Sequence, residues 1–377
     1  MALGKKVKGS IGAIIFGLIL ILAGISGTWW NEGRTIKTHK GLEQGAQSVH
    51  TSKTIDYISP ENDAKLIHIS GSVNTSETLS DGDFGLNIPH LKLKREVEMY
   101  QWKENKETKN EENSEENSTT YSYSKDWSQR LIDSQNFNDP TSHQNPKSKK
   151  YESFSKSVSK ASLGAHLLNP KQISRLNNWV ELKFSEISPV ADAQIMSSEG
   201  RPTQIYIGNT SLENPEIGNL RISYQVVYEG DYTLIAKQTG DSFEPFTTEK
   251  GTEINLLKTG IHSSESMFDE ELSENNFLKW LFRVIGFVVL FIGVRLLFSL
   301  VTLFTNFIPI IGSIVNFGVS LFSGIVAFCV FVIVAGIAWV FYRPVLGITL
   351  LVIGIGILLF FSEKGKKLKA RISESLT

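Results

Sequence analysis

The side chains best suited to metal binding or proton transfer in this 377-residue chain are seven histidines. All of them lie in the polar middle of the sequence, at His39, His50, His68, His90, His143, His166 and His262. None stands in an H-E-x-x-H pattern or at another spacing that suits a metal ion. We therefore expect no metal site and interpret the histidines as structural or solvent-facing.

Nucleophilic and acid–base chemistry has no better support. The single cysteine, Cys329, lies inside an apolar run, so neither a disulfide nor a cysteine-based metal site can form within one chain. Glu96 and Glu98 share one strand face and could act as paired carboxylates, but their neighbours Lys92 and Lys94 favour a solvated face. No nucleophile elbow, phosphate-binding loop or dinucleotide fingerprint occurs in strand–helix context. We expect neither enzymatic activity nor a cofactor.

Charged side chains within apolar segments are a better indication of function, because a charge in lipid is costly. Arg295 lies inside such a segment, where its stem could reach the cytoplasmic interface or its donors could meet Asn306 or Asn316. Arg283 and Arg343 lie at the ends of apolar segments and can snorkel to the interface. No Asp or Glu lies deep in an apolar segment, which argues against a transporter.

Small residues four positions apart let helices approach closely in lipid. Ala13 with Gly17, Ala23 with Gly27, and Ser320 with Gly324 have this spacing in the apolar segments. At about 100° per residue, the first two pairs lie about 120° apart on one helix. We expect one of them to contact other helices of the same chain and the other to contact a second copy in a homo-oligomer.

The elements that carry these residues follow from the distribution of apolar residues. The chain is 41% hydrophobic with a formal net charge of -1, which argues against a nucleic-acid partner. Long apolar runs lie almost entirely before residue 30 or after residue 277, unlike those of a soluble domain. Four runs are long enough to cross roughly 30 Å of hydrocarbon. They predict transmembrane helices at residues 11–30, 280–304, 317–341 and 345–361.

The segments between these runs predict the topology. Arg343-Pro344 suits a tight turn, and Pro309 and Gly312 favour an interfacial cytoplasmic loop at residues 305–316. Both ends of the chain are basic, through Lys5, Lys6, Lys8, Lys364, Lys366, Lys367, Lys369 and Arg371. Because basic flanks remain in the cytoplasm, we expect both termini, residues 1–10 and 362–377, to be cytoplasmic. Residues 31–279 then form an extramembrane domain on the periplasmic or lumenal side.

This extramembrane domain is predicted to be rich in β-structure. Residues 91–99 alternate between apolar and polar side chains with an exception at Arg95, and a second β-prone run begins at Thr120. Between them, residues 103–118 are almost wholly polar, so we expect a mobile loop at a hairpin tip. Residues 220–228 and 232–238 predict a second hairpin, and 65–69 an earlier strand. Short helices are expected at 170–176 and 264–275, the first opened by Asn169-Pro170.

Several motifs in fixed order resemble those of one known family. They are Trp30-Asn31-Glu32-Gly33-Arg34 with Lys37-Thr38, Glu98-Met99-Tyr100-Gln101-Trp102, Thr120-Tyr121-Ser122-Tyr123 with Trp127, Asp133-Ser134 with Phe137, Asn145-Pro146, Gly218-Asn219-Leu220-Arg221 and Phe341-Tyr342-Arg343-Pro344. Together they are similar to the transmembrane protein 43 (LUMA) family over nearly the whole chain. The resemblance implies an α+β membrane protein with four transmembrane helices and a large β-rich domain between the first and second.

The resemblance also carries expectations about place and partners. Animal members are placed in the endoplasmic reticulum and inner nuclear membrane, as organisers of membrane protein complexes that associate with themselves, lamins and emerin. The family's Asp-Trp-Phe-Pro is Asn306-Phe307-Ile308-Pro309 here, and its following Arg-Asp is Gly312-Ser313, so a charged cytoplasmic contact is lost. These departures and the Lys/Asn/Glu-rich composition favour a bacterial member in the inner membrane. The animal partners are then not expected.

The function expected from these observations is that of a non-enzymatic, multi-pass membrane scaffold that self-associates and organises other membrane proteins, in contact with membrane lipid. Two alternatives remain open. A channel or transporter component requires a polar path, which the apolar segments hardly supply. A lipid-sensing or lipid-handling protein requires an apolar cavity in the β-rich domain.

Overall fold

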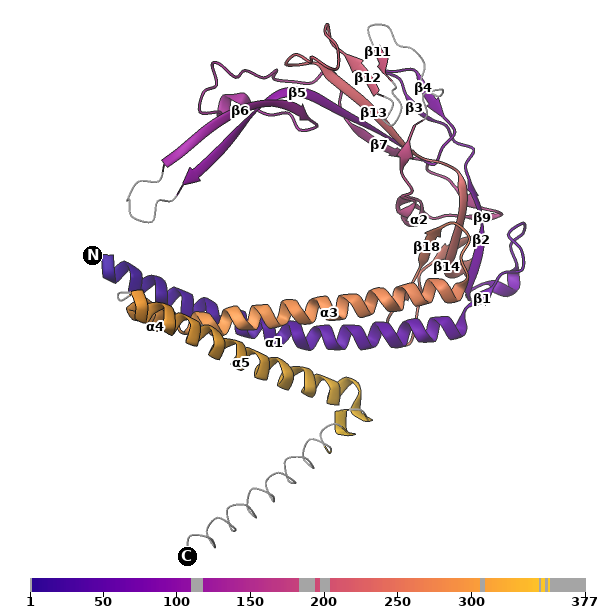
Figure 1. Cartoon of the computed structure of the whole chain (residues 1–377). Helices are drawn as coiled ribbons and strands as arrows, with labels where there is room; N and C mark the ends of the chain where they lie inside the picture. The colour runs from indigo at the N-terminus through magenta and orange to yellow at the C-terminus, as the bar shows by residue number, and fades with distance from the viewer. Residues whose placement is uncertain are drawn as a thin grey trace, which may run out of the picture. The chain divides into compact units, whose positions relative to one another are not determined.

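The computed structural model describes residues 2–109, 118–182, 194–196, 204–305, 309–345, 347–349 and 352. The chain divides into two compact units, and the three segments 1–48, 247–253 and 265–377 make up the first. The second unit consists of residues 49–246 and 254–264. The first is helical, and the second contains two large β-sheets (Figure 1).

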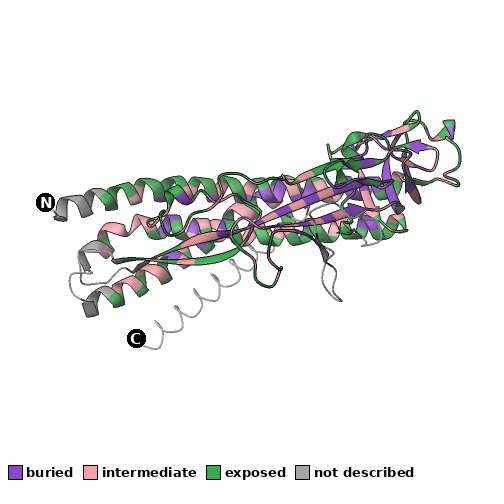
Figure 2. Cartoon of the chain, turned by 90° about the horizontal axis from the view of Figure 1, so that it is seen from above, coloured by how far each residue is buried: buried purple, intermediate pink, exposed green. Residues whose placement is uncertain are grey.

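The helical unit is built from α1 (Ala2–Ser48), α3 (Ser264–Leu297), α4 (Ser299–Thr305) and α5 (Pro309–Tyr342). Three helices among the described residues, within Gly9–Ser48, Ser264–Leu297 and Ser313–Tyr342, are long and apolar enough to cross a membrane. They contain the whole of the predicted segments 11–30 and 317–341, and residues 280–297 of the predicted segment 280–304. The predicted fourth helix, 345–361, falls almost entirely outside the described residues. Large apolar side chains such as Ile15, Phe317 and Ile333 are exposed, as the green stretches along the helices in Figure 2 show.

Two helices of this unit are longer than the predicted membrane segments that they contain. First, α1 continues to Ser48, because the residues after Trp30 are rich in strong helix formers such as Glu, Lys and Gln. Second, the segment predicted as a loop at 305–316 is helical from Pro309 onwards. Pro309 is the first residue of α5, where its missing N–H costs no helical hydrogen bond, so it starts a helix rather than preventing one.

The β-rich unit has two seven-stranded sheets. The first has the order β15-β14-β2-β8-β9, with β1 on β2 and β18 on β14. The second has the order β11-β12-β13-β5-β6, with β10 on β13 and β7 on β5. The strands and short helices of the chain are β1 (His50–Thr51), η1 (Pro60–Asn62), β2 (Leu66–Asn74), β3 (Leu79–Asp81), β4 (Leu86–Ile88), β5 (Lys92–Lys109), β6 (Ser118–Ser128), η2 (Ser134–Asn136), β7 (Phe154–Ser157), β8 (Ser162–Leu163), β9 (His166–Leu167), α2 (Pro170–Arg175), β10 (Val180–Glu181), β11 (Gln194–Met196), β12 (Gln204–Ile207), β13 (Leu220–Val227), β14 (Gly230–Thr239), β15 (Ser242–Glu244), β16 (Phe246–Thr247), β17 (Glu253–Ile254) and β18 (Leu256–Thr259).

One apolar core serves both sheets. Ile67 and Leu234 from the first sheet belong to the same buried cluster as Leu93, Val97 and Ile222 from the second. These residues stand at alternate positions of their strands, as a one-sided core requires. The short helix α2 is capped as predicted, since Asn169 and Gln172 each accept a hydrogen bond from the other's backbone N–H.

The two predicted hairpins have different outcomes. β5 and β6 pair from Met99 with Ser128 to Lys109 with Ser118, so residues 103–109 are strand and not loop. Residues 110–117 lie outside the described part of the chain. The hairpin predicted for 220–238 is wrong, because β13 pairs with β5 and β12 whereas β14 pairs with β2, β15 and β18. A short sequence separation favours a hairpin. Here β13 instead pairs with β5 over eight residues and β14 pairs with β2 over eight residues, so the two strands belong to different sheets.

Candidate functional site

A buried carboxylate connects three helices of the helical unit. Glu32 of α1 is 2% exposed and forms a bidentate ion pair with Arg283 of α3, with Nε–Oε1 and Nη2–Oε2 distances of 2.7 and 2.9 Å. The indole Nε1 of Trp339 on α5 donates to Oε2 of Glu32 at 2.8 Å. The Arg283 guanidinium also lies over the Trp280 ring, 4.8 Å from its centroid. Both oxygens of the carboxylate are therefore occupied, and the arrangement suits helix association rather than proton transfer.

Amide side chains extend this polar contact along α1 and α3. Asn31 Nδ2 donates to the backbone oxygen of Lys279 at 3.1 Å. One turn away, Asn275 donates to the backbone oxygen of Thr35 at 3.0 Å and accepts from Arg34 at 3.1 Å. Hydrogen bonds between helices stabilise association where lipid provides no hydrophobic driving force between them.

Two motifs far apart in the sequence meet at this site. The Trp29 ring lies 5.7 Å from Phe341 and 5.8 Å from Tyr342, centroid to centroid. Gly33 packs so closely on Tyr342 that an added Cβ would lie 2.6 Å from the ring. The segments 30–34 and 341–344 therefore form one structural unit, which we call the three-helix junction, together with Arg283 and Trp339.

The sequence predicted Arg283 at the end of an apolar segment but did not indicate its partner, Glu32. Arg283, which was expected to be able to snorkel to the interface, has a side chain that is 13% exposed and paired with Glu32. Glu32 was missed because the predicted first helix ended at residue 30. A signal was present: Gly17, Gly24, Thr28, Asn31 and Thr35 are buried at spacings of three, four and seven, a helical stripe that runs past residue 30.

The small residues divide between the inside and the outside of the helical unit. Gly17 lies against Gly293 of α3, where an added Cβ would be 2.7 Å from the Gly293 oxygen. Ala13 is half-buried, whereas Ala23 and Gly27 are exposed, and no described atom lies within 4 Å of a Cβ added at Gly27. Gly24, which the spacing did not indicate, contacts Leu290.

The remaining predicted residues of α3 and α5 lie as follows. Ser320 donates to the backbone oxygen of Asn316 within its own helix, at 2.7 Å. A Cβ added at Gly324 would lie 3.8 Å from the Phe291 ring, an ordinary contact distance. Arg295 is exposed and lines a pocket of about 260 Å³ together with Asn316. Arg343 is exposed at the end of α5, where its backbone N–H donates to Trp339 at 2.7 Å.

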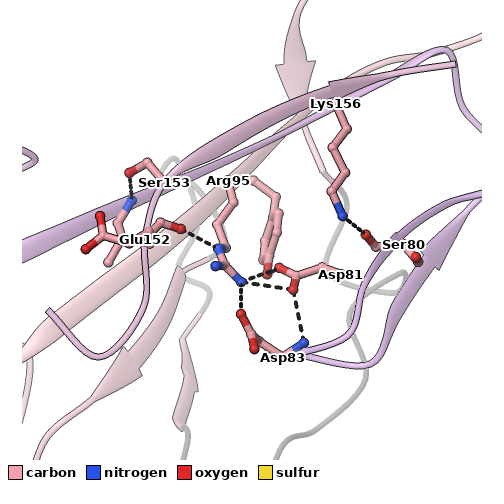
Figure 3. A network of polar contacts seen from close by, with 9 residues as sticks. Ser80, Asp81, Asp83, Arg95, Glu152, Ser153 and Lys156 are labelled. Atoms are coloured by element: carbon pink, nitrogen blue, oxygen red, sulfur yellow. Dashed lines mark hydrogen bonds and ion pairs between the residues drawn. The ribbon is translucent and has the colours of Figure 1, made fainter. Parts of the chain in front are cut away.

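A second buried ion pair lies in the β-rich unit and explains the irregular position in the alternation of β5 (Figure 3). Arg95 is 5% exposed, and its Nη1 donates to both oxygens of Asp81, at 2.9 and 2.8 Å, and to Asp83 at 2.8 Å. Tyr224 donates to Asp81 at 2.5 Å. Arg95 thus points into the core like its apolar neighbours, with its charge neutralised there.

The electrostatics of this cluster keep its charges fixed. Burial disfavours the charged form of Arg95, but the hydrogen bond to Asp83 and the negative charge of Asp81 outweigh it and raise the pKa of Arg95. Burial and the bond to Asp81 raise the pKa of Tyr224 far above its ordinary value, so the hydroxyl stays protonated. The cluster therefore acts as a structural contact in which the guanidinium stays charged and the phenol stays protonated.

The other side chains of β5 also have structural partners. Lys92 is buried and donates to the backbone oxygen of Ser174 at 2.6 Å, so the interpretation of a solvated face is wrong at that position. Glu98 accepts from Arg221 at 2.5 Å, and Glu96 pairs with Lys94. These carboxylates do not form a pair for acid–base chemistry.

The loop at residues 129–147 is attached to the β5–β6 hairpin through residues of the recognised motifs. The Asn145 side chain accepts from the Trp102 N–H at 2.7 Å and donates to the Trp102 oxygen at 3.0 Å, like a neighbouring strand. Gln101, fully buried, accepts from the Ile132 N–H at 2.8 Å. A pocket of about 720 Å³ lies within this loop, but its lining residues, such as Asp133 and Gln144, are largely exposed.

The histidines have local partners as well. His68 Nε2 lies 2.8 Å from the backbone oxygen of His262, His143 stacks on Tyr123 at 3.6 Å, and buried His166 stacks on Phe243 at 5.3 Å. Among the described residues, no three His, Cys, Asp or Glu side chains come together to hold a metal ion.

The chain has apolar helices joined by a buried ion pair, and a β-rich domain follows the first of these helices in sequence. These features define a membrane protein of α+β architecture. The chain belongs to the Transmembrane protein 43 family, whose model matches residues 99–344. It is 31% identical to Transmembrane protein 43 of Homo sapiens over 353 residues, which are 90% of this chain and 87% of the relative. It is 28% identical to the Transmembrane protein 43 homolog of Drosophila melanogaster over 368 residues, 93% and 94% of the two chains. No solved structure matches.

Proposed function

We propose that this chain is a non-enzymatic membrane scaffold that associates with itself and with other membrane proteins. The observation that carries the proposal is the open small-residue face of α1. Ala23 and Gly27 are exposed there, while the packing inside the helical unit uses Gly17 and Gly24. A second helix could approach this free face closely, which is how small residues promote association in lipid.

The buried charges support a structural role. Arg95 and Arg283 are each paired with carboxylates that hold helices or strands together. Such pairs fix the arrangement of the elements and leave few groups for catalysis. The animal partners of the family are not carried over, because we propose that this member lies in a bacterial inner membrane, on the composition and loop departures described above.

Self-association is tested by substitution on α1 of the full-length chain in lipid nanodiscs or detergent. Gly27→Leu should shift the mass measured by light scattering toward monomer, because the larger side chain prevents close approach. Ser26→Leu is the matched control: it adds a similar side chain at an exposed position about 100° away on the same helix. A wild-type chain that is already monomeric, or equal effects of both changes, would contradict the proposal.

We further propose four transmembrane helices, the fourth at residues 345–361, with both termini cytoplasmic. Support comes from the basic flanks at both ends of the sequence and from the apolar composition of residues 345–361. The test places single cysteines in a chain in which Cys329 is replaced by serine. A thiol reagent that cannot cross membranes should label Glu61→Cys from outside intact cells and leave Lys6→Cys unlabelled. Labelling of Lys6→Cys from outside would show that the orientation is wrong.

A further inference from the structure

An apolar groove runs between α3 and α5 beside the three-helix junction. It has a volume of about 620 Å³ and is lined by aromatic and aliphatic side chains, among them Trp280, Val284, Phe287, Phe328 and Trp339. Val284 and Phe328 are 59% and 60% exposed, so the side chains of the described residues leave the groove open. The groove lies between two helices that are each long and apolar enough to cross a membrane, so lipid acyl chains can reach it.

One end of this groove is positively charged. Arg283 lines the groove, and Lys279 lies one turn before it on α3, with its ammonium 5.7 Å from the Trp280 ring centroid. Arg343 follows Trp339 by one turn on α5. The charges of Arg283, Arg343 and Glu32 all act on Lys279, so this end carries three cations and one carboxylate. Glu32 forms its ion pair with Arg283, and the Lys279 ammonium donates to Asn276 Oδ1, so the positive charges outnumber the negative one among the described residues at this end.

We propose that this groove binds an anionic phospholipid, with an acyl chain along the apolar part and the phosphate between Lys279 and Arg343. The argument is charge complementarity: an amphipathic, negatively charged molecule matches a groove that is apolar along its length and positive at one end. Trp280 and Trp339 line the groove beside Arg283, whose guanidinium lies 4.8 and 5.6 Å from their ring centroids. Tryptophans of membrane proteins commonly stand next to lipid headgroups. Basic pockets between membrane helices select anionic headgroups in the same way.

The test uses the full-length chain in nanodiscs of phosphatidylcholine, alone or with a minor fraction of phosphatidylglycerol, and counts retained lipids by native mass spectrometry. The wild type should retain phosphatidylglycerol in preference to phosphatidylcholine. Lys279→Gln and Arg343→Gln should each weaken this retention about fivefold, the effect of one basic residue near an anionic lipid. Neither change removes a hydrogen-bonding partner of the Glu32–Arg283 pair, and an unchanged circular dichroism spectrum checks that each variant is folded. Arg295→Gln removes an exposed cation that does not line the groove and is the control.

The apolar part is tested separately on α5. Gly336 lines the groove and has no atom within 4 Å of an added Cβ, so Gly336→Leu should fill the groove and reduce retention of both lipids. Gly318→Leu is the matched control, because Gly318 is an equally open glycine of α5 outside the groove. Equal retention of the two lipids, or unchanged retention in the double variant Lys279→Gln with Arg343→Gln or in Gly336→Leu, would overturn the proposal. So would disulfide cross-linking of Gly336→Cys to a cysteine within residues 345–361 or to a second chain, which would identify a protein occupant.

Discussion

Removal of the charge on Glu32 should destabilise the helical unit strongly. Glu32→Gln keeps an oxygen that can accept from Trp339 but leaves the Arg283 guanidinium without its counter-charge at a site where the Glu32 side chain is 2% exposed. Loss of one partner of a buried ion pair costs about 3–5 kcal/mol, because the remaining charge stays desolvated. We expect a loss of this size in the free energy of unfolding.

The assay is unfolding of the full-length chain in detergent by titration with a denaturing detergent, followed by circular dichroism. Glu43→Gln is the matched control, since the His39–Glu43 pair on the same helix is exposed, at 41% and 52%, and such pairs contribute less than about 1 kcal/mol. The double variant Glu32→Leu with Arg283→Met should recover most of the loss, because it removes both charges. Equal losses in Glu32→Gln and Glu43→Gln, or no recovery in the double variant, would refute a buried pair.

Three further predictions concern the β-rich unit, each measured by thermal or denaturant unfolding of the full chain. Asn145→Ala removes both side-chain hydrogen bonds to the Trp102 backbone and should lower the free energy of unfolding by about 1–3 kcal/mol. The loop at 129–147 should then become sensitive to protease, and an unchanged digestion pattern would contradict this. Arg95→Met leaves Asp81 buried without its cation and should cost about 3–5 kcal/mol, most of it recovered by adding Asp81→Asn. Burial lowers the pKa of His166 below its ordinary value of 6.5, so the unfolded chain takes up the proton first and stability should fall as the pH drops below about 6.5. His166→Phe should remove that part of the pH dependence, and an unchanged profile would show that another group is responsible.

Much of the candidate site could be located, but not assembled, from the sequence. The spacing of small residues indicated Gly17, which does lie at a helix contact, and the apolar runs placed Arg283 at a helix end. The sequence alone did not indicate which residue pairs with Arg283. Glu32 and Arg283 are 251 positions apart, and nothing local to either residue specifies that distance. The same holds for Arg95: its break in the alternation was visible, but Asp81 and Tyr224 were not.

The sequence by itself determined the elements, because these depend on local patterns. Runs of apolar residues indicated four membrane helices, three of which correspond to candidate spans among the described residues. Alternation indicated β5, a β-rich run indicated β13, and Asn169-Pro170 indicated α2. The tertiary structure decided which strands pair and which charged side chains meet. β13 and β14 are joined by a short turn yet belong to different sheets, since each gains a full-length partner and an apolar face only with a strand distant in sequence. The Glu32 carboxylate could be buried only where Arg283 and Trp339 arrived from two other helices, because a charge loses its water without large cost only when all its hydrogen-bonding atoms find partners at once.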